Sequence, residues 1–145
     1  MSDSERDGLV ERFAAFPSRL AEAVHVAGPT PAGEWSPAEV VRHLIAVEDE
    51  VHRFRLASLA RGGEPRWSWT EPGLAPGFDG APLDTVLAAF ATARAGTVDV
   101  VRSLDEADWA RSGIHATFGR LDVAGLLRLA TDHDEEHQAG IAPTD

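Results

Sequence analysis

Two segments of the sequence carry histidines at positions that a single metal ion could share. His133 and His137 are four residues apart in the run His-Asp-Glu-Glu-His, and this spacing places both imidazoles on one face of a helix. His43 lies three residues after Val40 and four before Val47, at the border of an apolar stripe. Imidazole suits zinc, nickel, copper and iron, and three protein ligands leave one coordination position open. The pattern predicts a catalytic type of metal site made of His43, His133 and His137.

A simpler interpretation stays open for these histidines. They can be residues at the edge of the core that form hydrogen bonds with carboxylates and hold no metal. Acidic residues are abundant around the second motif, and they mostly form a polar face from which one carboxylate could orient a metal-bound imidazole. These residues are Asp132, Asp134, Glu135 and Glu136.

The second motif also invites comparison with metalloproteases. The run from His133 to His137 fits the H-x-x-E-H pattern and approximates H-E-x-x-H, with Asp134 in place of Glu. Both protease types take a third ligand from further along the chain. Only eight residues follow His137, and none is a His or a Glu. The sequence therefore argues against a metalloprotease.

The remaining histidines are interpreted as ordinary residues. His52 is nine residues after His43, which is about half a helical circumference in a regular helix, so the two cannot share an ion there. His25 and His115 fall near loops, and each is expected to be a surface or loop residue rather than a ligand. Glu50 shares the face of His43, seven residues on, and is interpreted as a solvated carboxylate at the rim, with a role as a fourth ligand or an orienting group as the alternative.

Three further residues have both a functional and a structural interpretation. Arg94 lies on the inward side of its helix and is expected to extend its head group to solvent, although it could pair with a substrate carboxylate. Trp67 and Trp69 could line the mouth of a pocket or pack beneath a long loop.

The elements that position these residues are predicted to be helices. Ser36 and Glu39 form a capping box with Pro37 at the first helical position, and Asp122 is a second predicted N-cap. Pro17 is expected to kink or split the first helix. No sheet is predicted, apart from a short extended piece within residues 113–119. Apolar residues spaced by three or four predict helices over residues 4–24, 36–59, 83–104 and 124–141.

The fold class that follows is all-α, a four-helix bundle in one domain over residues 1–145. Residues 62–82 form a long connection rich in Pro and Gly, which would let the second and third helices run parallel. The net charge is −11, which argues against nucleic acid as a partner. No segment is apolar enough for a membrane span and no leader is evident, so a cytoplasmic protein is expected. Cys is absent, so any thiol must come from a cosubstrate.

At this point the chain resembles a known family. Residues 34–44, Glu-Trp-Ser-Pro-Ala-Glu-Val-Val-Arg-His-Leu, and the motif from His133 to His137 are similar, in order and placement, to the two motifs of DinB/YfiT-like proteins. The resemblance implies a four-helix bundle that holds a divalent metal, zinc or nickel, on His43, His133 and His137. It also implies a homodimer. Gly140 stands where relatives often carry a Gln, which would weaken catalysis more than metal binding.

The resemblance further implies an activity. Better-understood relatives use the metal to activate a low-molecular-weight thiol, such as mycothiol, bacillithiol or glutathione, for S-transfer or isomerisation. The expected function is therefore a metal-dependent, thiol-dependent transferase whose partners are a thiol and a small-molecule electrophile. Two alternatives stay open: a hydrolase that uses metal-bound hydroxide, and a non-catalytic stress-response or binding bundle with a structural metal. Catalytic residues are not assigned, and no residue is assigned to an organic cofactor.

Overall fold

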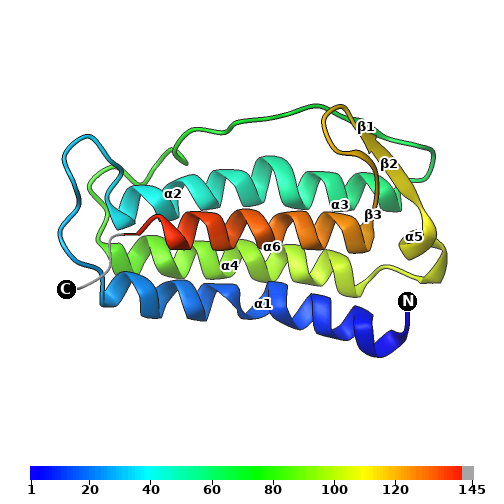
Figure 1. Ribbon diagram of the computed structural model, residues 1–145, viewed down its shortest axis with the longest axis horizontal. Helices are drawn as coiled ribbons and strands as arrows, with labels where there is room; N and C mark the ends of the chain where they lie inside the picture. The colour runs from blue at the N-terminus through cyan, green and yellow to red at the C-terminus, as the bar shows by residue number, and fades with distance from the viewer. Residues whose placement is uncertain (142–145) are drawn as a thin grey trace.

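Long helical segments lie side by side in the computed structural model, which describes residues 1–141 (Figure 1). Two of them, α1 and α6, run in one direction, and the rod made of α2, η1 and α3 runs in the opposite direction together with α4. The predicted all-α four-helix bundle with a long crossover is confirmed, and the crossover joins two parallel helices. The bounds are α1 Asp3–His25, α2 Pro37–Val47, η1 Glu48–His52, α3 Arg53–Ala60, α4 Leu83–Arg102 and α6 Val123–Ala139.

The predicted helix starts are confirmed by their capping contacts. The amide of Glu39 donates to the Ser36 hydroxyl at 3.2 Å, and the Glu39 carboxylate accepts from the Ser36 amide at 3.0 Å. At the start of α6, the Asp122 carboxylate accepts from the Gly125 amide at 2.8 Å. These contacts satisfy amides that have no partner within the helix, and so they fix where each helix begins. The positions of the site histidines along α2 and α6 follow from these two starts.

Pro17 does not split the first helix, because α1 runs without interruption from Asp3 to His25. A proline has no N–H, so the carbonyl four residues earlier, that of Phe13, loses its helical partner. Arg94 of α4 supplies a replacement by donating from Nη1 to the Phe13 carbonyl oxygen at 2.8 Å. A contact between two helices therefore compensates for the proline.

A small sheet at one end of the bundle was not predicted (Figure 1). It has the order β1-β2-β3, with β1 Arg66–Trp67 parallel to β2 Ser112–His115, and β2 antiparallel to β3 Gly119–Asp122. The expected extended piece is confirmed in the β2–β3 hairpin, which follows the short helix α5, Glu106–Ala110. The expectation of no sheet is wrong, because strands of two to four residues are too short to show a clear alternation.

The crossover is tied to the bundle along its course. The Ala75 amide donates to the carbonyl of Arg42 on α2, and the Arg42 guanidinium donates to the Ala75 carbonyl and to the Asp79 carboxylate. Trp67 is buried and donates from Nε1 to the Ser58 hydroxyl, whereas Trp69 is exposed. Trp67 therefore has the structural role of packing beneath the connection.

The interior between the helices is filled by apolar side chains from every long helix. Phe16 and Phe90 meet edge to face near the middle of α1 and α4, with ring centroids 6.0 Å apart. Such packing of apolar stripes provides most of the stability of helices in proteins. Among the helices within residues 1–141, none combines the length and apolar character that crossing a bilayer requires.

Candidate metal centre

His43 is the buried member of the predicted histidine group. It lies on α2 with 5% of its surface exposed, and its Nδ1 is 3.1 Å from the carbonyl oxygen of Gly73 in the crossover. Since a carbonyl only accepts, Nδ1 carries the proton and Nε2 keeps a free lone pair. The ring of Trp35 packs against it, with centroids 4.9 Å apart. The imidazole is therefore held in one orientation and one tautomer.

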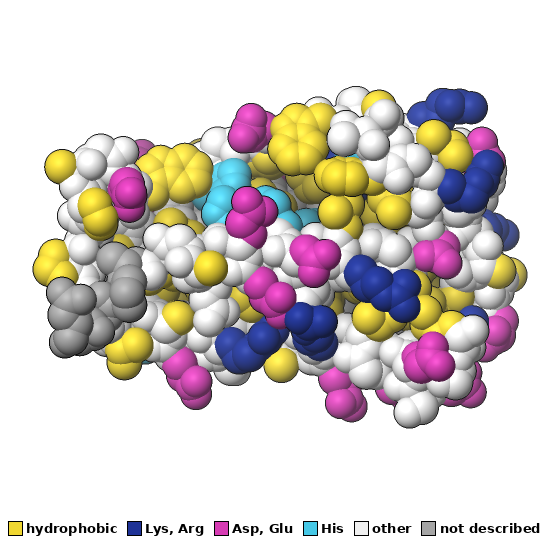
Figure 2. All heavy atoms as spheres, viewed as in Figure 1, with side chains coloured by type: hydrophobic (Ala, Val, Ile, Leu, Met, Phe, Trp, Pro, Cys, Tyr) yellow, Lys and Arg dark blue, Asp and Glu magenta, His cyan; other side chains and the backbone are white. Residues whose placement is uncertain are grey.

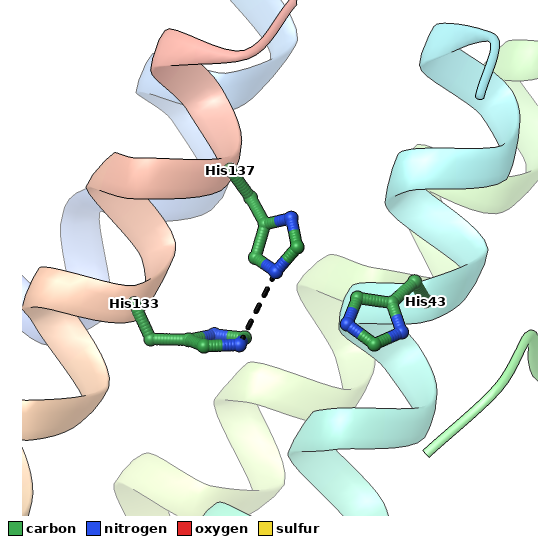
Figure 3. Close-up of side chains that lie close together, drawn as sticks. All are labelled: His43, His133 and His137. Carbon is green, nitrogen blue, oxygen red and sulfur yellow. Dashed lines mark hydrogen bonds between the residues drawn. The ribbon is translucent and has the colours of Figure 1, made fainter. Parts of the chain in front are cut away.

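His133 and His137 lie one turn apart on α6 and face His43 across the bundle (Figure 3). Their Nε2 atoms are 3.2 Å apart. The ring centroid of His43 is 6.1 Å from that of His133 and 4.8 Å from that of His137. One nitrogen from each residue lies within 4.8 Å of the others. The three residues predicted from the sequence are thus brought together between α2 and α6.

This geometry fits a small divalent cation. Two imidazole nitrogens that bind one tetrahedral ion at about 2.0–2.1 Å lie about 3.4 Å apart, close to the separation seen between His133 and His137. Metal binding also requires unprotonated imidazoles. Burial, followed by the charges of His137, His52 and His43, lowers the pKa of His133 to about 3. Burial and then His43 lower the pKa of His137. Both rings are therefore neutral donors near pH 7.

The simpler interpretation, in which carboxylates satisfy these histidines, finds no support in residues 1–141. His43 bonds to a backbone carbonyl, and His133 and His137 bond to each other. In that part of the chain, a histidine–carboxylate contact occurs at His25, which meets Asp84 at the surface. Among the described residues, the polar contacts of the three imidazoles are therefore with backbone and with each other, not with carboxylates.

A buried ion triad lies directly beside the histidines, and the expectation for Arg94 is wrong. Arg94 is 1% exposed and does not reach solvent. Its Nε and Nη2 donate to the Glu48 carboxylate, and Nη2 also donates to both oxygens of Asp134, at 3.1 and 3.0 Å. Burial lowers the pKa of Arg94, but the two carboxylates outweigh it and raise the pKa overall. Burial raises the pKa of Asp134 to about 7, against the opposing effect of Arg94.

His52 lies beside the histidine group, because the helix that carries it is not regular. The turn η1 is π-helical, and the Arg53 amide bonds to the carbonyl of Glu48, five residues back. One additional residue is thereby taken up, which turns everything after it back by about 100°. His52 is then about 80° from His43 around the axis instead of about 180°. Its ring centroid is 5.8 Å from that of His133.

Of the other predictions for single residues, those for His25 and Glu50 are confirmed and that for His115 is not. His25 and Glu50 are exposed, as expected. His115 is 1% exposed on β2, so the surface or loop position expected for it is wrong. Its Nδ1 accepts from the amides of Thr117 and Phe118, at 3.0 and 3.2 Å. Burial, followed by the charge of Arg55, lowers the pKa of His115.

Histidine atoms are visible at the surface in a hollow of the face drawn in Figure 2, with hydrophobic side chains on both sides. Of the aromatic residues, Trp35 is 44% exposed while it contacts His43. His133 and His137 are half-buried, so the group is partly accessible to a small molecule.

The fold and the site together define a class of protein: an all-α bundle with three histidines grouped between its second helix and its last. The sequence model of the DinB superfamily matches residues 3–141, so the chain belongs to the DinB superfamily. This agrees with the resemblance seen in the two motifs. A search of curated proteins finds no match.

Two solved structures share this fold. YfiT from Bacillus subtilis, described as a probable metal-dependent hydrolase with an unusual four-helix bundle topology, superposes with a TM-score of 0.71 at 20% identity, over 97% of this chain and 86% of its own. TT2238, described as a four-helix bundle protein, superposes with a TM-score of 0.64 at 28% identity, over 92% of this chain and 94% of its own. Both likenesses extend over nearly the whole chain.

Proposed function

We propose that His43, His133 and His137 bind one divalent ion, zinc or nickel, and that the chain is a metal-dependent transferase acting with a low-molecular-weight thiol. The observation that carries the proposal is the 3.2 Å separation of the Nε2 atoms of His133 and His137, opposite a His43 whose Nδ1 is already engaged. A bound ion would supply Lewis-acid chemistry, lowering the pKa of a thiol or a water and polarising an electrophile.

The nucleophile comes from outside the chain. The sequence has no Cys. The two buried carboxylates beside the histidines, Glu48 and Asp134, are both held in ion pairs by Arg94. A thiol loses its proton near pH 8.5, far more readily than water at about 15.7. A thiol therefore needs less help from a general base than water does, and this favours a thiol as the nucleophile.

The chain's own residues restrict what can reach the site. His43 is held against the crossover by Gly73, and Trp35 covers one side of its ring while remaining partly exposed. An apolar wall next to an open coordination position suits a small electrophile with an apolar body. Catalysis here would depend on holding the electrophile beside the thiol in the right geometry.

A hydrolase is the second candidate. YfiT, described as a probable metal-dependent hydrolase, has the same fold. In this chain Glu136 is exposed on α6, and its charge acts on His137. A carboxylate in that place could accept a proton from an attacking water. This route needs no thiol, and so an assay with and without a thiol distinguishes the two candidates.

Metal content tests the site itself. Protein purified without a histidine tag is analysed by plasma mass spectrometry, together with His43→Ala, His133→Ala and His137→Ala. His25→Ala is the matched control, because His25 is exposed and its side chain bonds to Asp84, away from the histidine group. We expect about one zinc or nickel per chain in the parent and the control, and loss of the ion in the three variants. A metal content well below one ion per chain that stays the same in all variants, even after reconstitution with metal, would overturn the proposal.

Turnover then separates the functions. Metal-loaded protein is incubated with model electrophiles and with activated esters, each with and without glutathione, mycothiol or bacillithiol. Turnover that requires a thiol supports the transferase, and turnover in water alone supports the hydrolase. A metal that raises the melting temperature while none of these compounds is converted supports the non-catalytic bundle.

A further inference from the structure

His133 has one ring nitrogen that the three-histidine site does not use. Its Nε2 faces His137, while its Nδ1 is buried and has no hydrogen-bond partner among residues 1–141. The same holds for Nε2 of His52. The two rings meet edge to face at 84°, and a nitrogen of each lies within 4.8 Å of the other and of an Asp134 carboxylate oxygen. The two rings that each carry an unsatisfied buried nitrogen are thus neighbours, with centroids 5.8 Å apart.

Ring nitrogens within 4.8 Å of each other are close enough to be joined through one water, or directly after a small rotation of a ring. One water that forms two hydrogen bonds of about 2.8–3.0 Å joins groups about 4.6–4.9 Å apart. A buried polar atom left without a partner destabilises the folded state. A shared hydrogen bond would remove both penalties at once.

A second cation is the competing occupant of this space, and the surrounding charges oppose it. Both oxygens of Asp134 already accept from Arg94. The positive charges of Arg94 and Arg55 both act on His52. A cation placed between His52 and His133 would meet two guanidinium groups and a carboxylate that is already engaged. The space therefore suits a neutral donor and acceptor pair.

A histidine that binds a metal through one nitrogen normally donates the proton on the other to an acceptor. For His43 that acceptor is the Gly73 carbonyl. For His133 the adjacent carboxylate of Asp134 is held by Arg94, which leaves the lone pair on Nε2 of His52. The π-helical turn η1 is what places His52 on this side of the helix.

We infer that His52 is a positioning residue for the metal site: its Nε2 accepts, directly or through one water, the Nδ1–H of His133. This holds His133 in the tautomer whose Nε2 lone pair points at the ion, and it fixes the plane of the ring. The inference rests on the proposed metal site and adds a fourth histidine that does not touch the ion.

The first test is metal affinity, measured by competition with a chelator. His52→Leu removes the acceptor, and His52→Gln keeps one on a side chain of similar reach. His25→Leu is the control at an exposed histidine. We expect one ion per chain in all proteins. Affinity should fall about 10- to 100-fold in His52→Leu, as for other partners of ligating histidines. It should be largely restored in His52→Gln and unchanged in His25→Leu.

The second test is spectroscopic and distinguishes a hydrogen bond from mere packing. In zinc-loaded, ¹⁵N-labelled protein, the Nδ1–H of His133 should give a protected downfield proton signal. His43 should give a second signal through Gly73 and so serves as the internal reference. We expect the His133 signal to persist in His52→Gln and to vanish through exchange in His52→Leu, while the His43 signal stays.

Failure of the role proposed for His52 can be distinguished from failure of the metal site itself. An unchanged affinity and a persistent His133 signal in His52→Leu would overturn the role of His52 while the metal site stands. A parent protein that binds no ion would overturn both. If His52→Leu does not fold, as judged by circular dichroism, His52→Met fills the space with only a weak acceptor, and the same two readouts apply.

Discussion

The guanidinium of Arg94 donates to the carbonyl oxygen of Phe13, the carbonyl that Pro17 leaves without a helical partner. It also lies over the Phe13 ring, with Cζ 3.8 Å from the centroid. Its other nitrogens hold Glu48 and Asp134. One buried side chain on α4 therefore contacts α1, η1 and α6 at the level of the histidine group.

Removing the cation of this triad is expected to destabilise the fold strongly. Arg94→Met keeps much of the side-chain volume but leaves two buried carboxylates without a counter-charge. Such broken buried pairs cost about 3–5 kcal/mol. Urea denaturation of the metal-free protein measures the loss of unfolding free energy. A loss below about 1 kcal/mol would show that the triad is not desolvated as the structure indicates.

The matched control removes all three charges together. Replacing Arg94 and Glu48 by Met and Asp134 by Leu leaves no uncompensated charge, and such replacements are often neutral or stabilising. The triple variant is expected to be more stable than Arg94→Met alone. A triple variant less stable than the single one would contradict this explanation.

Pro17→Ala is expected to raise the unfolding free energy. A proline inside a helix costs about 3 kcal/mol relative to alanine, and the new amide could bond to Phe13 beside Arg94, because a carbonyl oxygen has two lone pairs. The gain should be about 1–3 kcal/mol, part of the cost being already offset by Arg94. Thermal and urea denaturation both report it. Destabilisation would mean that α1 needs the shape that Pro17 imposes.

His115 is expected to make stability fall on acidification. The folded protein holds it neutral, since Nδ1 accepts two amides and burial lowers its pKa. As the pH falls below about 6.5, the unfolded chain takes up a proton that the folded one refuses, and stability is lost. His115→Asn keeps an acceptor near Nδ1 and does not titrate. Between pH 7.5 and 5.5, the unfolding free energy of this variant should therefore fall less steeply with pH than that of the parent. The difference in slope should correspond to the uptake of up to about one proton on unfolding.

Gly113→Ala is expected to disrupt the small sheet. A Cβ there would lie 2.4 Å from Cη2 of Trp67 and 2.8 Å from the Pro65 carbonyl oxygen. Neither neighbour yields easily, since one is a buried ring and the other is backbone. Gly8→Ala in α1 is the control, because no atom of the described part of the chain outside its own helix backbone lies within 4 Å of the added Cβ. This substitution should stabilise the helix by about 0.5–1 kcal/mol. Comparable melting temperatures for the two variants would contradict this packing.

The sequence was sufficient for the parts of the structure that are set locally. The starts of α2 and α6 follow from Ser36 and Asp122, whose capping contacts involve residues three positions away. Once those starts are known, helical periodicity places His43, His133 and His137 on inward faces. The bundle and the grouping of these histidines were therefore predictable.

The buried triad was harder to predict, although its signal is present in the sequence. Arg94, Glu48 and Asp134 each occupy an inward position of a separate helical segment, which is unusual for charged residues. Each one alone is compatible with a side chain that extends to water. Only the packing of three segments shows that the charges meet.

The sheet and the position of His52 could not be predicted from hydrophobic periodicity, because neither is determined by it. Trp67 pairs with His115 through a parallel contact between segments far apart in the chain. The position of His52 depends on the π-helical turn, and the sequence of η1, Glu-Asp-Glu-Val-His, carries no distinct marker of it. The assumption of a regular helix therefore gave the wrong face for that histidine.

The π-helical turn also has a consequence for the core. Leu44 and Leu56 are both about 1% exposed, yet twelve residues of regular helix would separate them by about 120° around the axis. Taking up one additional residue reduces this offset to about 20°, so α2 and α3 present one continuous buried edge. The irregularity thus keeps two halves of a helix in phase. A regular α-helix over residues 48–52 with no residue removed would put the two halves out of phase, whereas removing one residue there would keep the offset of about 20° without any π-helical turn.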